Sequence, residues 1–237
     1  MGEVILITGT DTGAGKTVLT GLLLAHLRAA GIHALAMKPF CTGPRDDAEL
    51  LCELQDQEVP LDHVNPFHFS LPVAPSVAAR AAKRTVSLDR ALRAIRFLQD
   101  RCDTLLIEGV GGLFVPLGEK YMIADLIGAL RCPVLVAARN KLGVINHALL
   151  TIRALENQKI DTTTLVLMSD KSPDVSAKTN GRILAECLKS NRIESVPFLV
   201  GDLQRARVIR KHAVRQKKLL ARIAARSIVR PAFRFPK

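Results

Sequence analysis

A glycine-rich loop between a short apolar run and an apolar-periodic segment constrains this chain most strongly. Residues 4–17 read Val-Ile-Leu-Ile-Thr-Gly-Thr-Asp-Thr-Gly-Ala-Gly-Lys-Thr, and the apolar run 4–7 has the length of a buried strand. The segment 18–27 that follows is apolar at helical spacing. A strand, a glycine loop, Gly-Lys-Thr and a helix, in this order, predict a phosphate-binding P-loop.

The parts of such a loop have defined physical roles. Backbone N–H groups and the positive end of the following helix bind phosphate oxygens. Lys16 is expected to reach the β- and γ-phosphates, and the hydroxyl of Thr17 is expected to ligate Mg²⁺. One detail is unusual, because five residues separate Gly9 from Gly15 where the general pattern has four.

The charge of the chain is distributed very unevenly. The formal net charge is +12, but residues 203–237 contain 12 Lys+Arg and no Asp or Glu. The first 202 residues therefore carry 22 charges of each sign, as an ordinary enzyme does. The apolar spacing of the tail predicts an amphipathic last helix packed on the body with a solvated basic face. Attraction of the tail to nucleic acid or another anionic surface is the alternative.

Other sequence features favour a cytoplasmic protein. The five cysteines are scattered and form no C-x-x-C pair, which is typical of free thiols in a reducing compartment. No run of about 18 apolar residues predicts a membrane span. The N-terminus leads almost directly into a strand, which leaves no room for a signal peptide.

Alternation of strands and helices predicts the fold class. We expect one α/β domain over 1–237, with a mostly parallel central sheet, helices on both faces, and a basic helix and tail over 203–237. A loop is expected over 60–75, since Pro60, Pro66, Pro72 and Pro75 punctuate it. The predicted strands are 4–7, 33–37, 103–107, 133–137, 163–168 and, as a short strand or turn, 195–199; the predicted helices are 18–27, 48–54 with Asp46 or Asp47 as a cap, 76–82, 87–98, 122–130, 142–157 and 175–190, and the end 231–237 is expected to fray.

Chemically reactive side chains follow several of these strands. Lys38 and Thr42 come after the second strand, in a loop over 38–43, and Glu108 and a glycine turn over 108–112 come after the strand 103–107. Asn140 and Lys141 follow the strand 133–137. Ligands of parallel α/β sheets bind at the carboxyl ends of the strands. Phosphate and metal chemistry are therefore expected to meet at one edge of the sheet.

Five segments together resemble the dethiobiotin synthetase family, ATP-dependent enzymes that close the ureido ring in biotin synthesis. These segments are Thr8-Gly-Thr-Asp-Thr-Gly-Ala-Gly-Lys-Thr17, Met37-Lys-Pro-Phe-Cys-Thr-Gly43, Asn65-Pro-Phe67 with Pro72-Val-Ala-Pro75, Ile107-Glu-Gly-Val-Gly-Gly112 and Lys141-Leu-Gly-Val-Ile-Asn-His-Ala148. They occur in the family's order, and the five-residue spacing in the glycine loop is the family's own form.

The resemblance implies a homodimer with its active site at the interface. It implies that 7,8-diaminononanoate takes up CO₂ as a carbamate, that ATP with Mg²⁺ phosphorylates the carbamate to a carbamic-phosphoric anhydride, and that the second amine closes the ring to dethiobiotin. Charge spreads over several oxygens in such a transition state, so cations and N–H donors should dominate catalysis.

The resemblance also assigns residues by motif. It implies catalytic roles for Lys16, Lys38 and Thr42, and Mg²⁺ ligands at Thr17, Asp47 and Glu108, with Asp46 as a rival to Asp47. The implied nucleotide-binding residues are Thr12, Gly13, Ala14, Gly15, Lys16, Thr17, Val18, Ser169 and Pro197. The implied substrate-binding residues are Thr42, Gly111 and the helix start Gly143, Val144, Ile145 and Asn146, which would bind the substrate carboxylate from the partner subunit.

Two departures and one alternative remain. The family places an adenine-reading asparagine after the strand 163–168, where this chain has Ser169 and Asp170, so base preference stays open. Asn140 stands where a small or apolar residue is expected. The alternative function is a ParA- or MinD-like ATPase whose basic tail binds DNA or an anionic surface. Such ATPases usually carry an extra lysine early in the P-loop, and residues 9–12 (Gly-Thr-Asp-Thr) contain none.

Overall fold

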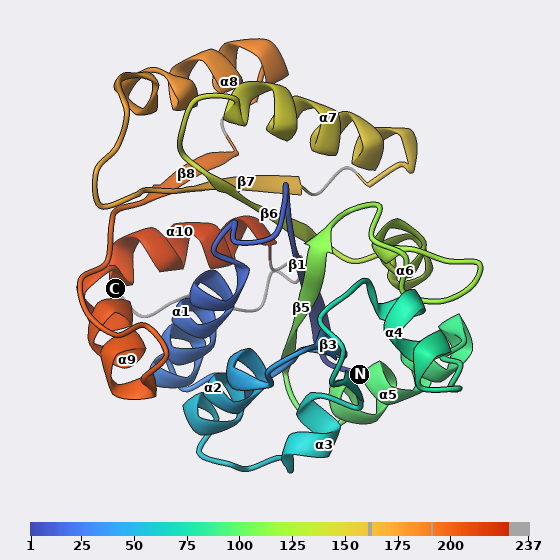
Figure 1. Ribbon diagram of the computed structural model, residues 1–237. Coiled ribbons are helices and arrows are strands. Elements are labelled where there is room, and N and C mark those ends of the chain that lie inside the picture. The colour runs from blue at the N-terminus through green and yellow to red at the C-terminus, as the bar shows by residue number, and fades with distance from the viewer. Residues whose placement is uncertain (161–162, 191, 228–237) are drawn as a thin grey trace.

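A six-stranded parallel sheet forms the centre of the computed structural model, which describes residues 1–160, 163–190 and 192–227. The strand order is β2-β5-β1-β6-β7-β8 (Figure 1). The central position of β1 places the glycine loop that follows it in the middle of the carboxyl edge. The strands are β1 (Glu3–Gly9), β2 (Ala34–Met37), β5 (Thr104–Gly112), β6 (Val134–Arg139), β7 (Thr163–Met168) and β8 (Ile193–Val196).

Helices cover both faces of this sheet, so the predicted three-layer fold is confirmed. One face is covered by α1 (Lys16–Ala29), α9 (Ala206–Arg215) and α10 (Lys217–Ser227), which pack against one another. The other face carries α5 (Leu88–Gln99), α6 (Ile123–Leu130), α7 (Val144–Asn157) and α8 (Asn180–Leu188), and α7 and α8 lie side by side in Figure 1. Buried on both faces, the strands are almost continuously apolar, as parallel sheets require.

A glutamine directly after the helix α2 (Asp46–Leu54) connects it to the edge strand β2. Gln55, which is fully buried, accepts a hydrogen bond from the backbone N–H of Ala36 (2.9 Å) and donates one to its carbonyl (3.3 Å). These bonds satisfy edge-strand groups that would otherwise be buried without partners. The contact therefore holds α2, and with it Asp47, close to the sheet.

The predicted loop over 60–75 is wrong in part, because it contains the short helix α3 (Leu61–Val64) and the strand β4 (Phe67–Phe69). β4 pairs in parallel with β3 (Phe40–Thr42), which lies inside the loop predicted over 38–43. Strands of three residues are too short to show an alternating pattern, and these two are stabilised by pairing with each other. The helix α4 (Pro75–Ala81) follows where a helix was predicted.

Other boundaries also differ from the predictions. β5 runs through Glu108 to Gly112 instead of turning after residue 107, because Gly112 still pairs with Gly9 of β1 after an irregularity in register. α2 begins at Asp46 itself, so Arg45 occupies the capping position and neither aspartate caps the helix. β8 begins at Ile193, two residues before the strand or turn predicted over 195–199.

The C-terminal third contains two further corrections. The helix predicted over 175–190 is divided into a 3₁₀ helix, η1 (Val175–Lys178), and α8. The basic tail forms two helices, α9 and α10, that meet at Gln216, and the predicted fraying of 231–237 lies outside the described residues. None of the helices in the described ranges is long and apolar enough to cross a membrane.

Candidate active site

The glycine loop adopts a conformation that requires glycine at its end. Gly15 has φ 91° and precedes the first residue of α1, so its backbone lies in the left-handed region that other residues adopt at a cost. A Cβ at this position would also stand 3.0 Å from Cγ of Met168, at the end of β7. The side chain of Lys16 is buried, and its Nζ donates to the carbonyl of Asp11 (3.0 Å).

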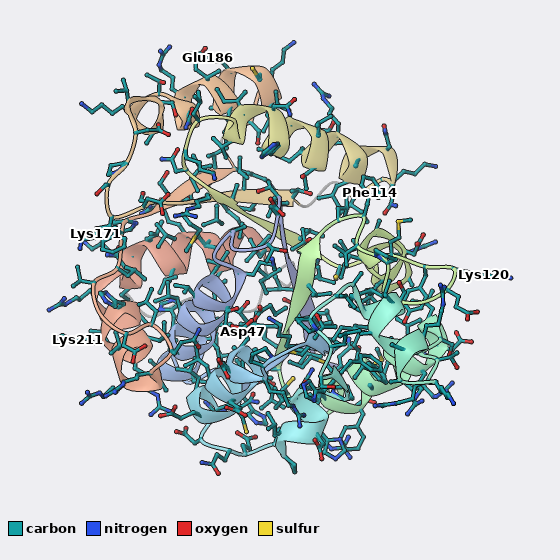
Figure 2. The ribbon with its side chains drawn as sticks, in the orientation of Figure 1. Asp47, Phe114, Lys120, Lys171, Glu186 and Lys211 are labelled. Carbon is teal, nitrogen blue, oxygen red and sulfur yellow. The ribbon has the colours of Figure 1, made fainter. Side chains whose placement is uncertain are left out.

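Four side chains from four segments form a charged cluster beside this loop. Lys38, at the end of β2, forms an ion pair with Asp47 of α2 and another with Glu108 of β5, whose Oε1 lies 2.8 Å from Nζ. The hydroxyl of Thr17 donates to the same Oε1 at 2.7 Å. Lys38 and Glu108 are buried, and Figure 2 shows Asp47 near the centre of the view.

The electrostatics keep Lys38 positively charged. Burial alone would lower its pKa, but the carboxylates of Glu108 and Asp47 outweigh burial and raise the pKa. Burial raises the pKa of Glu108, and the adjacent Lys38 ammonium limits that rise. Burial lowers the pKa of Lys16, and the positive charge of Lys38 lowers it further. Two ammonium groups near each other form a site that an anion would stabilise.

Glu108 carries an unsatisfied atom that points to a cation. Its Oε2 is buried and has no hydrogen-bond partner among the described residues, which costs about 1–3 kcal/mol for such a group. No group of three or more His, Cys, Asp or Glu side chains that could together hold a metal ion occurs in the part of the chain that the structure describes. The set Thr17, Asp47 and Glu108 instead offers hard oxygen donors, which suit Mg²⁺ when water and phosphate oxygens complete its shell.

A cavity of about 790 Å³ contains this cluster. That volume is within the range of sites for nucleotide-sized molecules. It brings together most of the residues that the sequence pointed to. These are Thr12, Gly13, Gly15, Lys16, Thr17, Val18, Lys38, Thr42, Asp47, Glu108 and Gly111.

Three expected nucleotide-binding residues do not line this cavity. Ala14 is buried in the core. Ser169 and Pro197 follow β7 and β8, where the N–H of Ser169 donates to the carbonyl of Val196 (3.0 Å). They stand at the same edge of the sheet, since the neighbouring Met168 contacts the glycine loop at Gly15.

The helix start over 143–146 also lies outside the cavity of its own chain. Gly143 has φ 94° and occupies the capping position of α7. The side chain of Val144 is buried, Ile145 is half-buried, and Asn146 is exposed. Asn146 is the third residue of α7, and the capping position belongs to Gly143, which has no side chain that could cap the helix. His147 is exposed on the helix surface.

The cavity has further walls, and apart from Asp46, the predicted rival of Asp47 as a metal ligand, their residues had no predicted site role. Asp46 lines it beside Asp47, but only Asp47 is paired with Lys38. The proline segment was recognised as a motif without a role, and Gln204 carried no signal in the sequence. The added lining residues are Cys41, Pro44, Asp46, Pro72, Val73, Ala74, Pro75, Val110, Val115 and Gln204.

Asn65 explains how Lys38 is held in place. Asn65 is almost fully buried, and its amide donates to the carbonyl of Lys38 at 2.7 Å. Its Oδ1 accepts from Nε of Arg45 at 3.1 Å. The N–H of Lys38 in turn donates to the carbonyl of Val64 (2.9 Å). The Asn-Pro-Phe motif therefore supports the backbone that carries the candidate catalytic lysine.

Asn140 has a structural role that accounts for its unexpected position. It is buried, and its amide nitrogen donates to the carbonyl of Ala177 (3.1 Å). Its Oδ1 accepts from the amide of Asn180 at 2.9 Å. This pair connects the end of β6 to the start of α8, which a small apolar residue would not do.

Two solved structures share this fold over almost the whole chain. The MinC:MinD cell division protein complex of Aquifex aeolicus superimposes with a TM-score of 0.62 at 19% identity, covering 99% of this chain and 100% of that chain. A ParA family ATPase from Chlorobium tepidum gives a TM-score of 0.60 at 12% identity, covering 95% of this chain and 99% of that chain. At these identities the likeness establishes the fold alone.

Sequence comparison goes further. A family model described as an AAA domain matches residues 3–207. The ATP-dependent dethiobiotin synthetase BioD of Anaeromyxobacter dehalogenans strain 2CP-1 is 39% identical over 208 residues, which is 86% of this chain and 93% of the relative. The BioD protein of Bacillus subtilis strain 168 is 34% identical over 200 residues, covering 81% and 84% of the two chains. The chain therefore belongs to the dethiobiotin synthetase family.

Proposed function

We propose that this protein synthesises dethiobiotin from 7,8-diaminononanoate, CO₂ and ATP in the presence of Mg²⁺. The observation that carries the proposal is the cluster of Lys38, Asp47, Glu108 and Thr17, which shares one cavity with the P-loop lysine Lys16. A P-loop alone serves many reactions, whereas a second buried lysine facing the loop suits transfer of a phosphoryl group to an anionic acceptor.

The proposed reaction has three balanced steps. One amine of the substrate adds to CO₂ and loses a proton, which leaves a carbamate. A carbamate oxygen attacks the γ-phosphorus of ATP, and ADP leaves. The second amine then attacks the carbonyl carbon of the mixed anhydride and loses a proton. A C–N bond forms, the C–O bond to the phosphate group breaks, phosphate leaves and the ureido ring closes.

The residues act mainly by positioning and by their charge. Lys16 would contact the β- and γ-phosphates, and Lys38 would hold the carbamate, so that cations approach the transferred group from two sides. Thr42 lines the cavity and would donate a hydrogen bond to the carbamate or the γ-phosphate. Thr17, Asp47 and Glu108 would hold Mg²⁺, which supplies charge neutralisation for the phosphates.

The substrate carboxylate would be bound by the N-terminus of α7 from the partner subunit of a homodimer. Gly143, Val144, Ile145 and Asn146 lie outside the cavity of their own chain, and a helix N-terminus favours an anion. Leu142, which precedes this helix start, is an apolar side chain that is 80% exposed and would also fit an interface. Figure 2 shows Phe114 on the other side of the molecule, near the end of α7. Sedimentation of the purified protein at micromolar concentration tests the dimer.

Base recognition would fall to Ser169, Pro197 and neighbouring backbone groups. Asp170 is occupied by Arg139, whose Nε donates to both of its oxygens at 2.9 and 2.8 Å. No asparagine side chain lies at this position to read adenine. Turnover measured with ATP, GTP and CTP in parallel would establish the preference.

Release of ADP in defined mixtures tests the proposal as a whole. We expect ADP release that requires the diamine and bicarbonate together, and that falls when either one is omitted. ADP release independent of both compounds would rule out this function and leave a different ATPase.

The alternative is a ParA- or MinD-like ATPase that binds DNA through α9. In α9 the exposed side chains of Arg207, Lys211 and Arg215 form no ion pair with any described residue, and they recur at intervals of four. Deleting 203–237 would be a poor test, because Ile209, Leu220 and Ile223 are part of the core. Replacing the three cations by glutamine is cleaner. DNA binding with a steep salt dependence that these replacements abolish would favour the alternative.

A further inference from the structure

A second cavity, of about 520 Å³, lies between α4, the start of α5 and the segment 118–121. No residue lines both this cavity and the candidate active site. Its volume suits a small molecule. The lining side chains that carry charge or hydroxyl groups are Ser76, Arg80, Lys83, Arg84, Thr85, Ser87, Glu119, Lys120 and Tyr121.

The charge around this cavity is strongly positive. Four cations and one carboxylate, Glu119, line it. Arg80, Lys83 and Lys120 are exposed and form no ion pair with any residue in the described ranges. Arg84 lies over the ring of Phe69 at 5.0 Å. Four cations therefore surround one concave space that contains a single carboxylate, which leaves a net positive charge.

The ring of Tyr121 forms part of the wall of this cavity. The residue is only 8% exposed, and its buried hydroxyl has no hydrogen-bond partner among the residues described. Burial raises its pKa to about 12, so the hydroxyl keeps its proton at neutral pH and is a donor. The hydroxyl oxygen is covered by protein and is not open to the cavity, so Tyr121 contributes its ring to the wall and not a bond to a molecule bound there.

Gly118 leaves the space that the ring of Tyr121 occupies. A Cβ on Gly118 would stand 2.2 Å from Cε1 of Tyr121 and 2.8 Å from the carbonyl of Val86. The segment 118–121 can therefore pack closely against the chain before α5 only with glycine at this point. The close approach brings Lys120 and Tyr121 to the cavity that Arg80 and Lys83 line from the other side.

The start of α5 adds further donors to the same cavity. Ser87 is the capping residue of this helix, and its hydroxyl accepts from the N–H of Arg90 at 3.3 Å. The hydroxyl proton of Ser87 and the exposed hydroxyl of Thr85 remain as donors toward an acceptor. The helix start itself favours negative charge.

We propose that this cavity binds a small anion that carries two or more linked phosphate groups. Cations from α4 and from the segment 118–121 and the hydroxyls before α5 provide donors on several sides, as a multi-oxygen anion requires. A free pyrophosphate and a nucleoside diphosphate share this chemistry. Lys120 projects at the right-hand edge of Figure 2, away from Asp47 of the candidate active site.

The test is isothermal titration with pyrophosphate in the absence of Mg²⁺. The P-loop cavity also attracts phosphates, so we separate the two sites with Lys16→Gln, which weakens only the P-loop site. We expect this variant to retain one site for pyrophosphate. In that background, Arg80→Gln with Lys83→Gln and Lys120→Gln should weaken the remaining site at least tenfold. Tyr121→Phe removes a hydroxyl that does not open into the cavity, so this variant should change the affinity less than twofold.

The matched control replaces three exposed cations outside the cavity, Arg93, Arg96 and Lys171, by glutamine. It changes the net charge equally and should alter pyrophosphate affinity less than twofold. A nucleoside diphosphate that binds at least tenfold more tightly than pyrophosphate would identify nucleotides as the source, whereas equal affinity would identify the phosphate chain. Loss of all binding in Lys16→Gln, or equal weakening by the control, would overturn the proposal. None of these outcomes depends on dethiobiotin synthesis.

Discussion

Replacing Lys38 by methionine should separate its structural role from its catalytic role. The Lys38 ammonium is buried, lies 2.8 Å from Oε1 of Glu108 and is also paired with Asp47. Methionine fills similar space but leaves Glu108 as a buried carboxylate with the Thr17 hydroxyl as its remaining partner. Removing one partner of a buried pair costs about 3–5 kcal/mol, which we expect as the loss in free energy of unfolding at pH 8.

The loss should depend on pH with a definite sign. Burial raises the pKa of Glu108, and without Lys38 the hydrogen bond from Thr17 is what still opposes that rise. An acid whose folded pKa is raised binds more protons in the folded state, so stability falls as the pH rises above the unfolded value of about 4.3. Urea unfolding of Lys38→Met should therefore show a smaller loss at pH 5.5 than at pH 8.

The double variant Lys38→Met with Glu108→Gln is the control. An amide in place of the carboxylate removes the uncompensated charge, so most of the lost stability should return. Catalysis should not return, because the positive charge near the transferred phosphoryl group is still missing; its loss is worth about 10²–10³-fold in kcat. The reasoning is refuted if Lys38→Met keeps its stability within about 1 kcal/mol, or if the rescue of stability also restores kcat.

Three further predictions concern the candidate active site and the C-terminal tail. Asn65→Ala leaves the carbonyl of Lys38 without its 2.7 Å donor. It should lower the free energy of unfolding by about 1–3 kcal/mol, measured with urea, and kcat/KM roughly tenfold, measured by ADP release. An unchanged kcat/KM would show that Asn65 does not position Lys38. Gly15→Ala should weaken ATP binding in a titration, because φ is 91° and Met168 lies 3.0 Å from the new Cβ. Adding Met168→Ala should recover only part of the loss, and full recovery would mean that the backbone is not strained. Truncation of residues 228–237 should leave kcat and the sedimentation coefficient unchanged, and a collapse of either would assign the tail end a role.

Much of the site could be predicted because parallel sheets bring the ends of their strands to one edge. Met37 of β2 pairs with Ile107 of β5, so the next residues, Lys38 and Glu108, necessarily become neighbours. β5 also pairs with β1, which brings Glu108 to Thr17 just after the glycine loop. Where strands end at a glycine or a charged residue, the sequence therefore predicts which residues meet in the middle of the cavity.

The rest depends on contacts that have no local signal. β3 and β4 are three residues each, and their pairing joins segments more than 20 residues apart. Gln204 reaches the candidate active site because α9 packs on α1, which no periodicity reports. The second cavity likewise depends on Gly118 meeting the ring of Tyr121, a contact between loop residues that only the folded chain creates.

Incorporation of ¹³C from bicarbonate tests directly whether this protein forms the ureido ring of dethiobiotin. The purified protein, ATP, Mg²⁺ and 7,8-diaminononanoate are incubated with ¹³C-bicarbonate, and the product is analysed by mass spectrometry while ADP is counted. We expect dethiobiotin that carries ¹³C at the ureido carbon, with one ADP released for each molecule formed. Formation of ADP without labelled product would contradict it.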